Sequence, residues 1–181
     1  MAAPGDVLEN PATGQWIRFL LTGDQTGGRL FRAELVVPPG GSAGPRHVHP
    51  AQREDFEVLS GRAVFTVGGW QQVAGPGERV NAPIGAPHTF RAIGDEELRL
   101  RLELRPAPPS TAAFFERYFE LGRQGRMNRW GMPGPLDMAL LWPLASEHVV
   151  LAGPPARAQD ALFRALAPLA RLLRRRRVSS G

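Results

Sequence analysis

Residues 41–61, GSAGPRHVHPAQREDFEVLSG, decide our interpretation of this chain, because they place two histidines and a glutamate at short, fixed intervals. In an extended strand alternate side chains point to the same side, so His47 and His49 project together, with their Cα atoms about 6.5–7 Å apart. Glu54 follows after four residues, enough for a turn or bulge that brings its carboxylate to the same side. Two imidazoles and one carboxylate could therefore meet at one metal ion.

A second stretch supplies a further histidine. Residues 77–88, GERVNAPIGAPH, are rich in turn residues and end at His88, where a new strand is expected to begin. If adjacent strands bring His88 alongside, three neutral imidazoles and a carboxylate would bind one divalent transition metal: Fe, Mn, Ni, Cu, Co or Zn. The chain has no cysteine, so every ligand must be nitrogen or oxygen. Such a set leaves one or two coordination positions open, which is more typical of a reactive site than of a structural one.

A metal-free interpretation of the same residues stays open. A lone His-x-His pair on a strand is more often a surface feature or a hydrogen-bonded core pair than a metal site. Here three of the four histidines fall on the expected ligand positions. The alternative is that the four residues are polar side chains of a metal-free pocket. The remaining histidine, His148, lies outside both stretches and is expected on the surface or in the core.

The two stretches resemble the two sequence motifs of the cupin superfamily in its small single-domain form. Residues 41–61 are similar to the first motif and residues 77–88 to the second, with 15 residues between them. One departure is Ala92, where the family commonly has asparagine; its loss puts in doubt a hydrogen bond near the ligands rather than metal binding. The resemblance covers about residues 30–105.

The resemblance implies a jelly-roll β-barrel with the metal inside, bound by His47, His49, Glu54 and His88. It also implies a small-molecule substrate or ligand and a homodimer. Cupin enzymes include oxygenases of the quercetinase or small-acid type, isomerases and decarboxylases. We expect a metal-dependent, oxygenase-type enzyme in which Glu54 accepts a substrate proton, with a non-catalytic protein that binds or senses a small ligand as the alternative.

The sequence around the two stretches favours an all-β fold. Residues 15–21 and 29–37 predict two strands, and short apolar runs separated by glycine and proline follow them. In residues 98–104 four leucines alternate with arginine and glutamate, the pattern of a strand with one buried face. About eight strands at this spacing predict a cupin jelly-roll barrel over residues 15–106, after an N-terminal segment of residues 1–14.

Helices are expected after the barrel, in an extension over residues 107–173. Three prolines within residues 106–109 end the last strand, and a helix should start near residues 110–111. Its apolar stripe is expected to pack on the barrel and consists of Phe114, Phe115, Tyr118, Phe119 and Leu121. A short helix from about residue 136 and a third helix after a pair of prolines complete the extension.

Three phenylalanines are candidates for the pocket wall. Phe56 and Phe90 lie two residues beyond Glu54 and His88, so strand alternation places them on the ligand side. Phe65 is the third candidate. Filling the core of the barrel is the alternative role, and both roles can hold together.

The charge separates the C-terminal end from the rest of the chain. Residues 157–181 hold seven arginines and one aspartate, a net charge of +6, whereas the whole chain carries +5. The remainder therefore has a net charge of −1, so no nucleic acid is expected as a partner of the barrel. Residues 174–181 are predicted to be a basic flexible tail, with contact to an anionic surface as the alternative.

Neither a secretory signal nor a membrane span is expected. The N-terminus lacks a basic region followed by an apolar one. The most apolar stretch, residues 136–153, is interrupted by Asp137, Glu147 and His148. We therefore expect a cytoplasmic protein.

Overall fold

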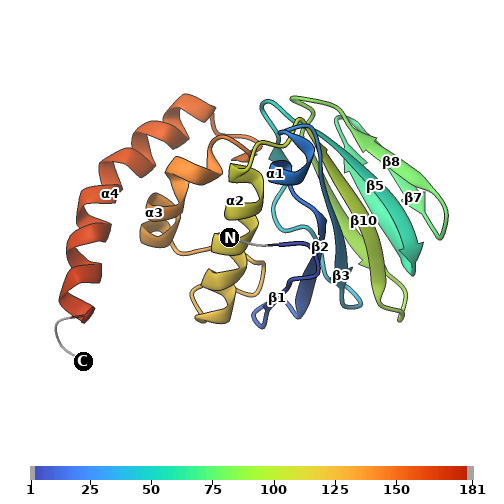
Figure 1. Ribbon diagram of the computed structural model, residues 1–181, viewed down its shortest axis with the longest axis horizontal. Coiled ribbons are helices and arrows are strands. Elements are labelled where there is room, and N and C mark those ends of the chain that lie inside the picture. The colour runs from blue at the N-terminus through green and yellow to red at the C-terminus, as the bar shows by residue number, and fades with distance from the viewer. Residues whose placement is uncertain (1–2, 179–181) are drawn as a thin grey trace.

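The computed structural model describes residues 3–178 and contains two β-sheets that face each other, with helices at one side (Figure 1). The six-stranded sheet has the order β1 (Val7–Asn10), β2 (Gln15–Leu21), β3 (Phe31–Val37), β10 (Leu98–Arg105), β5 (Arg53–Ser60) and β8 (Arg79–Ala82). The five-stranded sheet has the order β11 (Val150–Leu151), β4 (His47–Val48), β9 (His88–Ile93), β6 (Arg62–Val67) and β7 (Trp70–Ala74). The helices are α1 (Gly23–Thr26), α2 (Ser110–Arg123), α3 (Pro135–Ala145) and α4 (Ala156–Val178).

Strand β10 shows how alternation positions the core. Its four leucines are each at most 2% exposed, which confirms the buried face predicted from their spacing. On the other face, Arg101 pairs with Glu57 of β5 at 2.9 Å. Such partly exposed ion pairs contribute about 0–1 kcal/mol each, whereas burial of a leucine side chain contributes about 1.5–3 kcal/mol. The apolar face therefore dominates the stability of this strand.

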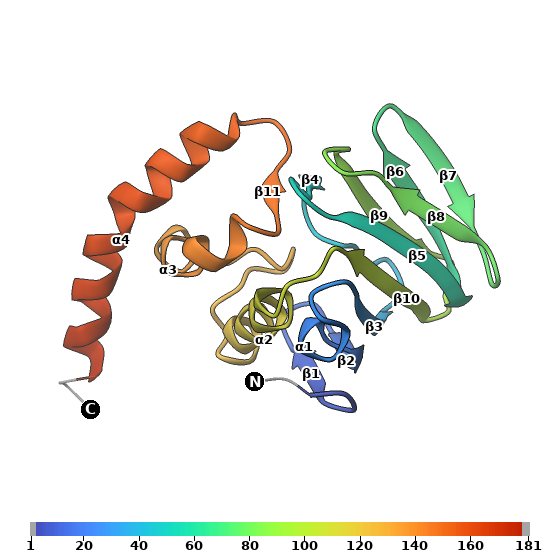
Figure 2. The same ribbon diagram turned by 45° about the horizontal axis from the view of Figure 1, so that its top comes forward.

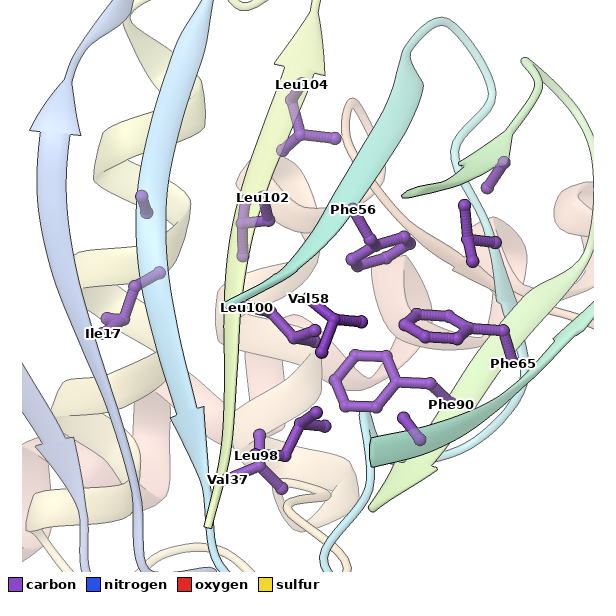
Figure 3. Packing of buried hydrophobic residues seen from close by; sticks show 14 of the residues in the cluster. Ile17, Val37, Phe56, Val58, Phe65, Phe90, Leu98, Leu100, Leu102 and Leu104 are labelled. Carbon is purple, nitrogen blue, oxygen red and sulfur yellow. The ribbon is translucent and has the colours of Figure 1, made fainter. Parts of the chain in front are cut away.

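Three phenylalanines fill the space between the two sheets. Phe56 of β5 points toward Phe65 of β6 and Phe90 of β9 (Figure 3). Their ring centroids lie 5.3–5.7 Å apart in tilted or edge-to-face arrangements, which aromatic rings prefer. Side chains from both sheets therefore meet in one core.

The prediction of a closed, all-β barrel needs correction. The antiparallel strands form two open sheets, and within residues 3–178 no pairing joins the edge strands of one sheet to those of the other. A turn at residues 75–78 carries the chain from β7 to β8, that is, from one sheet to the other, without continuing the hydrogen-bonded ladder. Helices α2, α3 and α4 add a helical layer. The fold is a cupin-like β-sandwich with a C-terminal helical part.

Two glycines of the first motif occupy positions that other residues would strain. Gly61 has a φ of +70°, and a Cβ there would lie 2.7 Å from the carbonyl oxygen of Glu97. A Cβ at Gly41 would lie 2.7 Å from Val37 Cγ1 and 2.9 Å from the Pro38 carbonyl oxygen. A left-handed backbone thus requires glycine at one end of the motif, and close packing requires it at the other.

Helix α2 begins at Ser110, where the sequence predicted a helix start. Part of its aromatic stripe packs on the six-stranded sheet, as expected, whereas Phe114 and Leu121 pack in a separate cluster with α3. The Phe115 ring stacks on Phe31 of β3 with centroids 5.0 Å apart, and Phe119 belongs to the main core. Helix α2 therefore lies between the sandwich and the remaining helices, beside β1 and β2 (Figure 1).

Helices α3 and α4 pack on each other farther from the sandwich. Pro135 occupies the first turn of α3, where its missing N–H is tolerated. The rings of Trp142 and Phe163 join the two helices, with centroids 4.7 Å apart.

Helix α4 includes Pro168 and continues to Val178. Residues 174–178, which the sequence assigned to the basic tail, are therefore helical, and residues 179–181 of that tail lie outside the described residues. None of the described helices is long and apolar enough to cross a membrane.

Candidate metal centre

The four expected ligands come from both sheets and meet at one end of the sandwich. His47 of β4 and His88 of β9 are register partners in the five-stranded sheet, and His49 directly follows β4. Glu54 lies on β5 of the six-stranded sheet, so its carboxylate approaches from the opposite sheet. One possible ligand atom of each residue lies within 4.8 Å of those of the other three. The structure thus brings together the side chains that the sequence singled out.

The carboxylate is the centre of this cluster. Glu54 Oε2 lies 3.1 Å from His49 Nε2 and 2.9 Å from His88 Nε2. His49 is 5% exposed, Glu54 6% and His88 2%, whereas His47 is half-buried. Buried polar groups need partners, and here they are one another's partners.

The second ring nitrogen of each histidine faces a main-chain carbonyl oxygen. The Nδ1 contacts are His47 to Pro45 (3.1 Å), His88 to Ala86 (2.9 Å) and His49 to His148. A carbonyl oxygen only accepts hydrogen bonds, so Nδ1 carries the proton and donates. In a neutral imidazole Nε2 then has the lone pair that a metal would take, and the ring orientation is fixed. The hydrogen bonds from Nε2 of His49 and His88 to Glu54 need a proton on Nε2, which metal binding would displace. Three such nitrogens and a carboxylate oxygen fit a divalent transition metal.

The pKa values reflect this mutual pairing. Burial raises the pKa of Glu54, but His49 and His88 outweigh burial and set it well below its usual value. Burial lowers the pKa of His88, but Glu54 outweighs burial and raises it. Burial and the charges of His49 and His88 lower the pKa of His47 to about 3. The cluster therefore combines an ionised carboxylate with a neutral imidazole at His47.

Residues 33–104, which include all four candidate ligands, match the family model described as "Cupin domain". The chain carries a cupin domain. A structure described as a predicted oxalate decarboxylase from Thermotoga maritima resembles it with a TM-score of 0.51 and 20% identity, over 59% of this chain and 99% of that chain. At that identity the likeness concerns the fold alone.

Two proteins of named function align with part of this chain. The quercetin 2,3-dioxygenase of Bacillus subtilis (strain 168) is 31% identical over 78 residues, which are 43% of this chain and 23% of that protein. The polyketide synthase CurC of Streptomyces cyaneus is 29% identical over 104 residues, 58% of this chain and 68% of that protein. The chain thus spans less than a quarter of the length of the Bacillus relative.

One contact to a candidate ligand comes from outside the cupin domain. His148 lies between α3 and β11, and its main-chain carbonyl accepts a hydrogen bond from His49 Nδ1. The His148 ring is buried in the core, with Nδ1 at 3.1 Å from Oε1 of Gln52. Gln52 Nε2 in turn donates to the Pro106 carbonyl at 2.8 Å and to the Thr111 hydroxyl at 3.2 Å. These bonds join the ligand-bearing segment to the helical extension.

No signal in the sequence pointed to this role of position 148. The acceptor is a main-chain carbonyl, which every residue type carries, so no side-chain pattern marks it. Gln52 lies inside the first cupin motif but at one of its variable positions. Only the folded arrangement brings the two residues together.

A cavity of about 160 Å³ adjoins the cluster. His47, His49 and Glu54 line one end of it. Phe56 and Phe90 also line it, as expected of pocket residues, and both belong to the core as well. Phe65 does not line this cavity but packs behind the other two rings in the core, 1% exposed.

Proposed function

We propose that this chain is a metal-dependent cupin enzyme of the oxygenase type that acts on a small molecule. The observation that carries the proposal is a set of three carbonyl-anchored histidines whose ligand atoms lie within 4.8 Å of one another and of a Glu54 oxygen, beside a cavity. A divalent transition metal bound there supplies Lewis acidity and, if redox-active, electrons for dioxygen. The identity of 31% with a quercetin 2,3-dioxygenase over part of the chain supports this reaction class.

The four candidate ligands have different expected roles. His47, His49 and His88 would hold the ion through Nε2, with Glu54 as the fourth ligand. Glu54 also lines the cavity, so its carboxylate is the group that could take up a proton from a bound molecule. The largely apolar wall lowers the local dielectric, which strengthens charge interactions within the site.

The second candidate is a cupin that binds or senses a small molecule without turnover. The two hydrogen bonds that hold Glu54 Oε2 favour it, because a carboxylate fixed by two imidazoles is poorly placed to move a proton. Isomerase and decarboxylase chemistry are further possibilities for the same ligands. Oxygen consumption distinguishes an oxygenase from all of these.

Metal analysis of histidine variants tests the ligand assignment. We expect His49→Ala to lose most bound metal while circular dichroism still shows a folded chain. His148→Gln is the matched control, because it removes the fourth imidazole but keeps the carbonyl that His49 contacts and a polar side chain beside Gln52, so it should lose far less metal. Full metal occupancy in His49→Ala, or equal loss in His148→Gln, would reject the assignment.

Oxygen uptake tests the reaction class. The chain loaded with iron, manganese, copper, nickel or cobalt is assayed against phenols, diketones and carboxylic acids, with the zinc-loaded chain as the redox-inactive control. Glu54→Gln keeps an oxygen donor but loses the charge, so we expect weaker metal binding and a larger loss of turnover. Tight binding of a panel compound without oxygen uptake in any metal form would favour the binding protein.

We also propose a homodimer. Apolar side chains on the edge strand β7 support it, since Trp70 and Val73 are each 46% exposed. Sedimentation at micromolar concentration should show about twice the mass of the chain. A single species of 19.7 kDa would reject the dimer.

A further inference from the structure

The imidazole and carboxylate groups of the cavity wall gather at one end, beside the candidate metal centre. His47, His49 and Glu54 form that end, and the rest of its wall is largely aromatic, aliphatic or thioether. The helical side of the wall includes Phe114, Phe115 and Tyr118 of α2 and Met138, Leu141 and Trp142 of α3. A molecule in this cavity would therefore touch polar atoms mainly where the metal is expected.

The polar groups elsewhere in the wall already have partners. The Tyr118 hydroxyl donates to the Gly131 carbonyl (2.7 Å), Trp142 Nε1 to Asp160 (3.0 Å) and Gln15 Nε2 to the Ser42 carbonyl (2.6 Å). Among the described residues that line the cavity none is arginine or lysine, and Glu54 is the one carboxylate. A sugar, a phosphate ester or a dicarboxylate would leave buried polar groups unpaired, which is unfavourable.

Much of this apolar wall lies outside the cupin domain. The matched region ends at residue 104, whereas α2 and α3 begin at Ser110 and Pro135. Strand β11, which follows α3, pairs with β4 and so attaches the extension beside His47 (Figure 2). The cupin domain supplies the ligands, and the extension encloses the space in front of them.

The cavity is partly open, so its volume limits the size of the apolar group that it can take up. An apolar cavity of about 150 Å³ is known to stay dry and to bind benzene. The cavity here is about 160 Å³. An apolar body of roughly one aromatic ring, or a branched aliphatic group of similar size, fits that space.

We propose that the site takes a molecule with an apolar body of about one ring and with its oxygen donors at one end, and that α2 and α3 select it. Recognition of the oxygen donors rests on the metal binding proposed above. Recognition of the apolar body does not, because the wall that contacts it is formed by side chains alone. The two halves of the proposal can therefore be tested separately.

Two diketones with the same oxygen donors test selection in the zinc-loaded chain. Benzoylacetone carries one phenyl ring, and pentane-2,4-dione carries a methyl group in its place. Isothermal titration calorimetry should show that benzoylacetone binds at least tenfold more tightly. Equal affinity for the two diketones, or tighter binding of glucose 6-phosphate than of either, would overturn the proposal.

Variants of the wall assign selection to the helices. Ala145→Leu reduces the cavity from α3, and Met138→Gln adds a polar group to its wall. Each should reduce the preference for benzoylacetone about tenfold while pentane-2,4-dione binds as before. Met127→Gln is the matched control, because Met127 packs among the helices but does not line the cavity. A preference unchanged in both wall variants, or lost in the control, would contradict the role of the helices.

The metal-free chain tests the apolar wall alone. Saturating toluene should raise its thermal midpoint in the parent and in Met127→Gln, because a ligand that binds only the folded state stabilises it. Ala145→Leu should show at most half of that shift. No shift in the parent would overturn the apolar wall whatever the metal does. A shift in a chain that fails to bind zinc would instead reject the proposed metal site and leave the wall standing.

Discussion

Replacing Gln52 with methionine would show how firmly the helical extension is joined to the cupin domain. The Gln52 side chain is 2% exposed and makes three hydrogen bonds, to His148 Nδ1, the Pro106 carbonyl and the Thr111 hydroxyl. Methionine has a similar length and volume but makes none of these bonds. At about 1 kcal/mol for each bond, and more for a buried partner left unpaired, the free energy of unfolding should fall by about 3–5 kcal/mol.

Urea unfolding followed by circular dichroism measures this difference. Gln71→Met is the matched control, because Gln71 on β7 is exposed and makes one side-chain contact, 3.3 Å to Thr66. It should change the free energy by less than about 0.5 kcal/mol. Since His148 also holds His49, Gln52→Met should weaken metal binding about tenfold. Equal stability of the two variants would refute the view that Gln52 joins the two parts.

Three further predictions concern other parts of the chain. Tyr118 is the only tyrosine, and burial raises its pKa to about 12, so its absorbance should show no ionisation near pH 10, where the urea-unfolded chain titrates. Because the unfolded state loses the Tyr118 proton first, the free energy of unfolding should fall between about pH 10 and about pH 12. Ionisation of Tyr118 near pH 10 in the folded chain would contradict its burial. Gly77→Ala should lower the free energy of unfolding by about 1–2 kcal/mol, the cost of the positive φ of +84° alone, because the added Cβ meets no atom within 4 Å. Gly61→Ala should lower it further, because the main chain must also shift. Equal losses in urea unfolding would be evidence against the close approach at Gly61. Phe65→Ala should lower the free energy of unfolding by about 3–5 kcal/mol, and a loss below about 1 kcal/mol would mean that the ring does not fill the core.

The ligand cluster could be predicted because its signals are local. Alternation along a strand places His47 and His49 on one side, and the turn before His88 starts the strand that pairs with β4. To place Glu54 in the same cluster, one must also know that the short segment after His49 crosses to the other sheet. Motif spacing carried that information only through the family resemblance.

The cavity could not be predicted, because helical periodicity shows that a face is buried but not what it packs against. The aromatic stripe of α2 was visible in the sequence, yet Phe115 stacks on β3 and also lines the cavity. The open edges of the sheets had no signal either, since a strand pattern is the same in a closed barrel and in a sandwich. Phe65 illustrates the limit: parity places its side chain between the sheets, but its depth behind Phe56 and Phe90 depends on tertiary packing.

The hydrogen bond from His49 to a main-chain carbonyl has a consequence for how this site could change during evolution. A substitution at position 148 does not remove the acceptor, because any residue provides the same oxygen atom; its buried side chain is constrained by the separate contact with Gln52. A single insertion or deletion between α3 and β11 is a different matter, since it would move that oxygen away from the imidazole. Selection on this contact would therefore act on the number of residues in the connection and leave little trace in their identities.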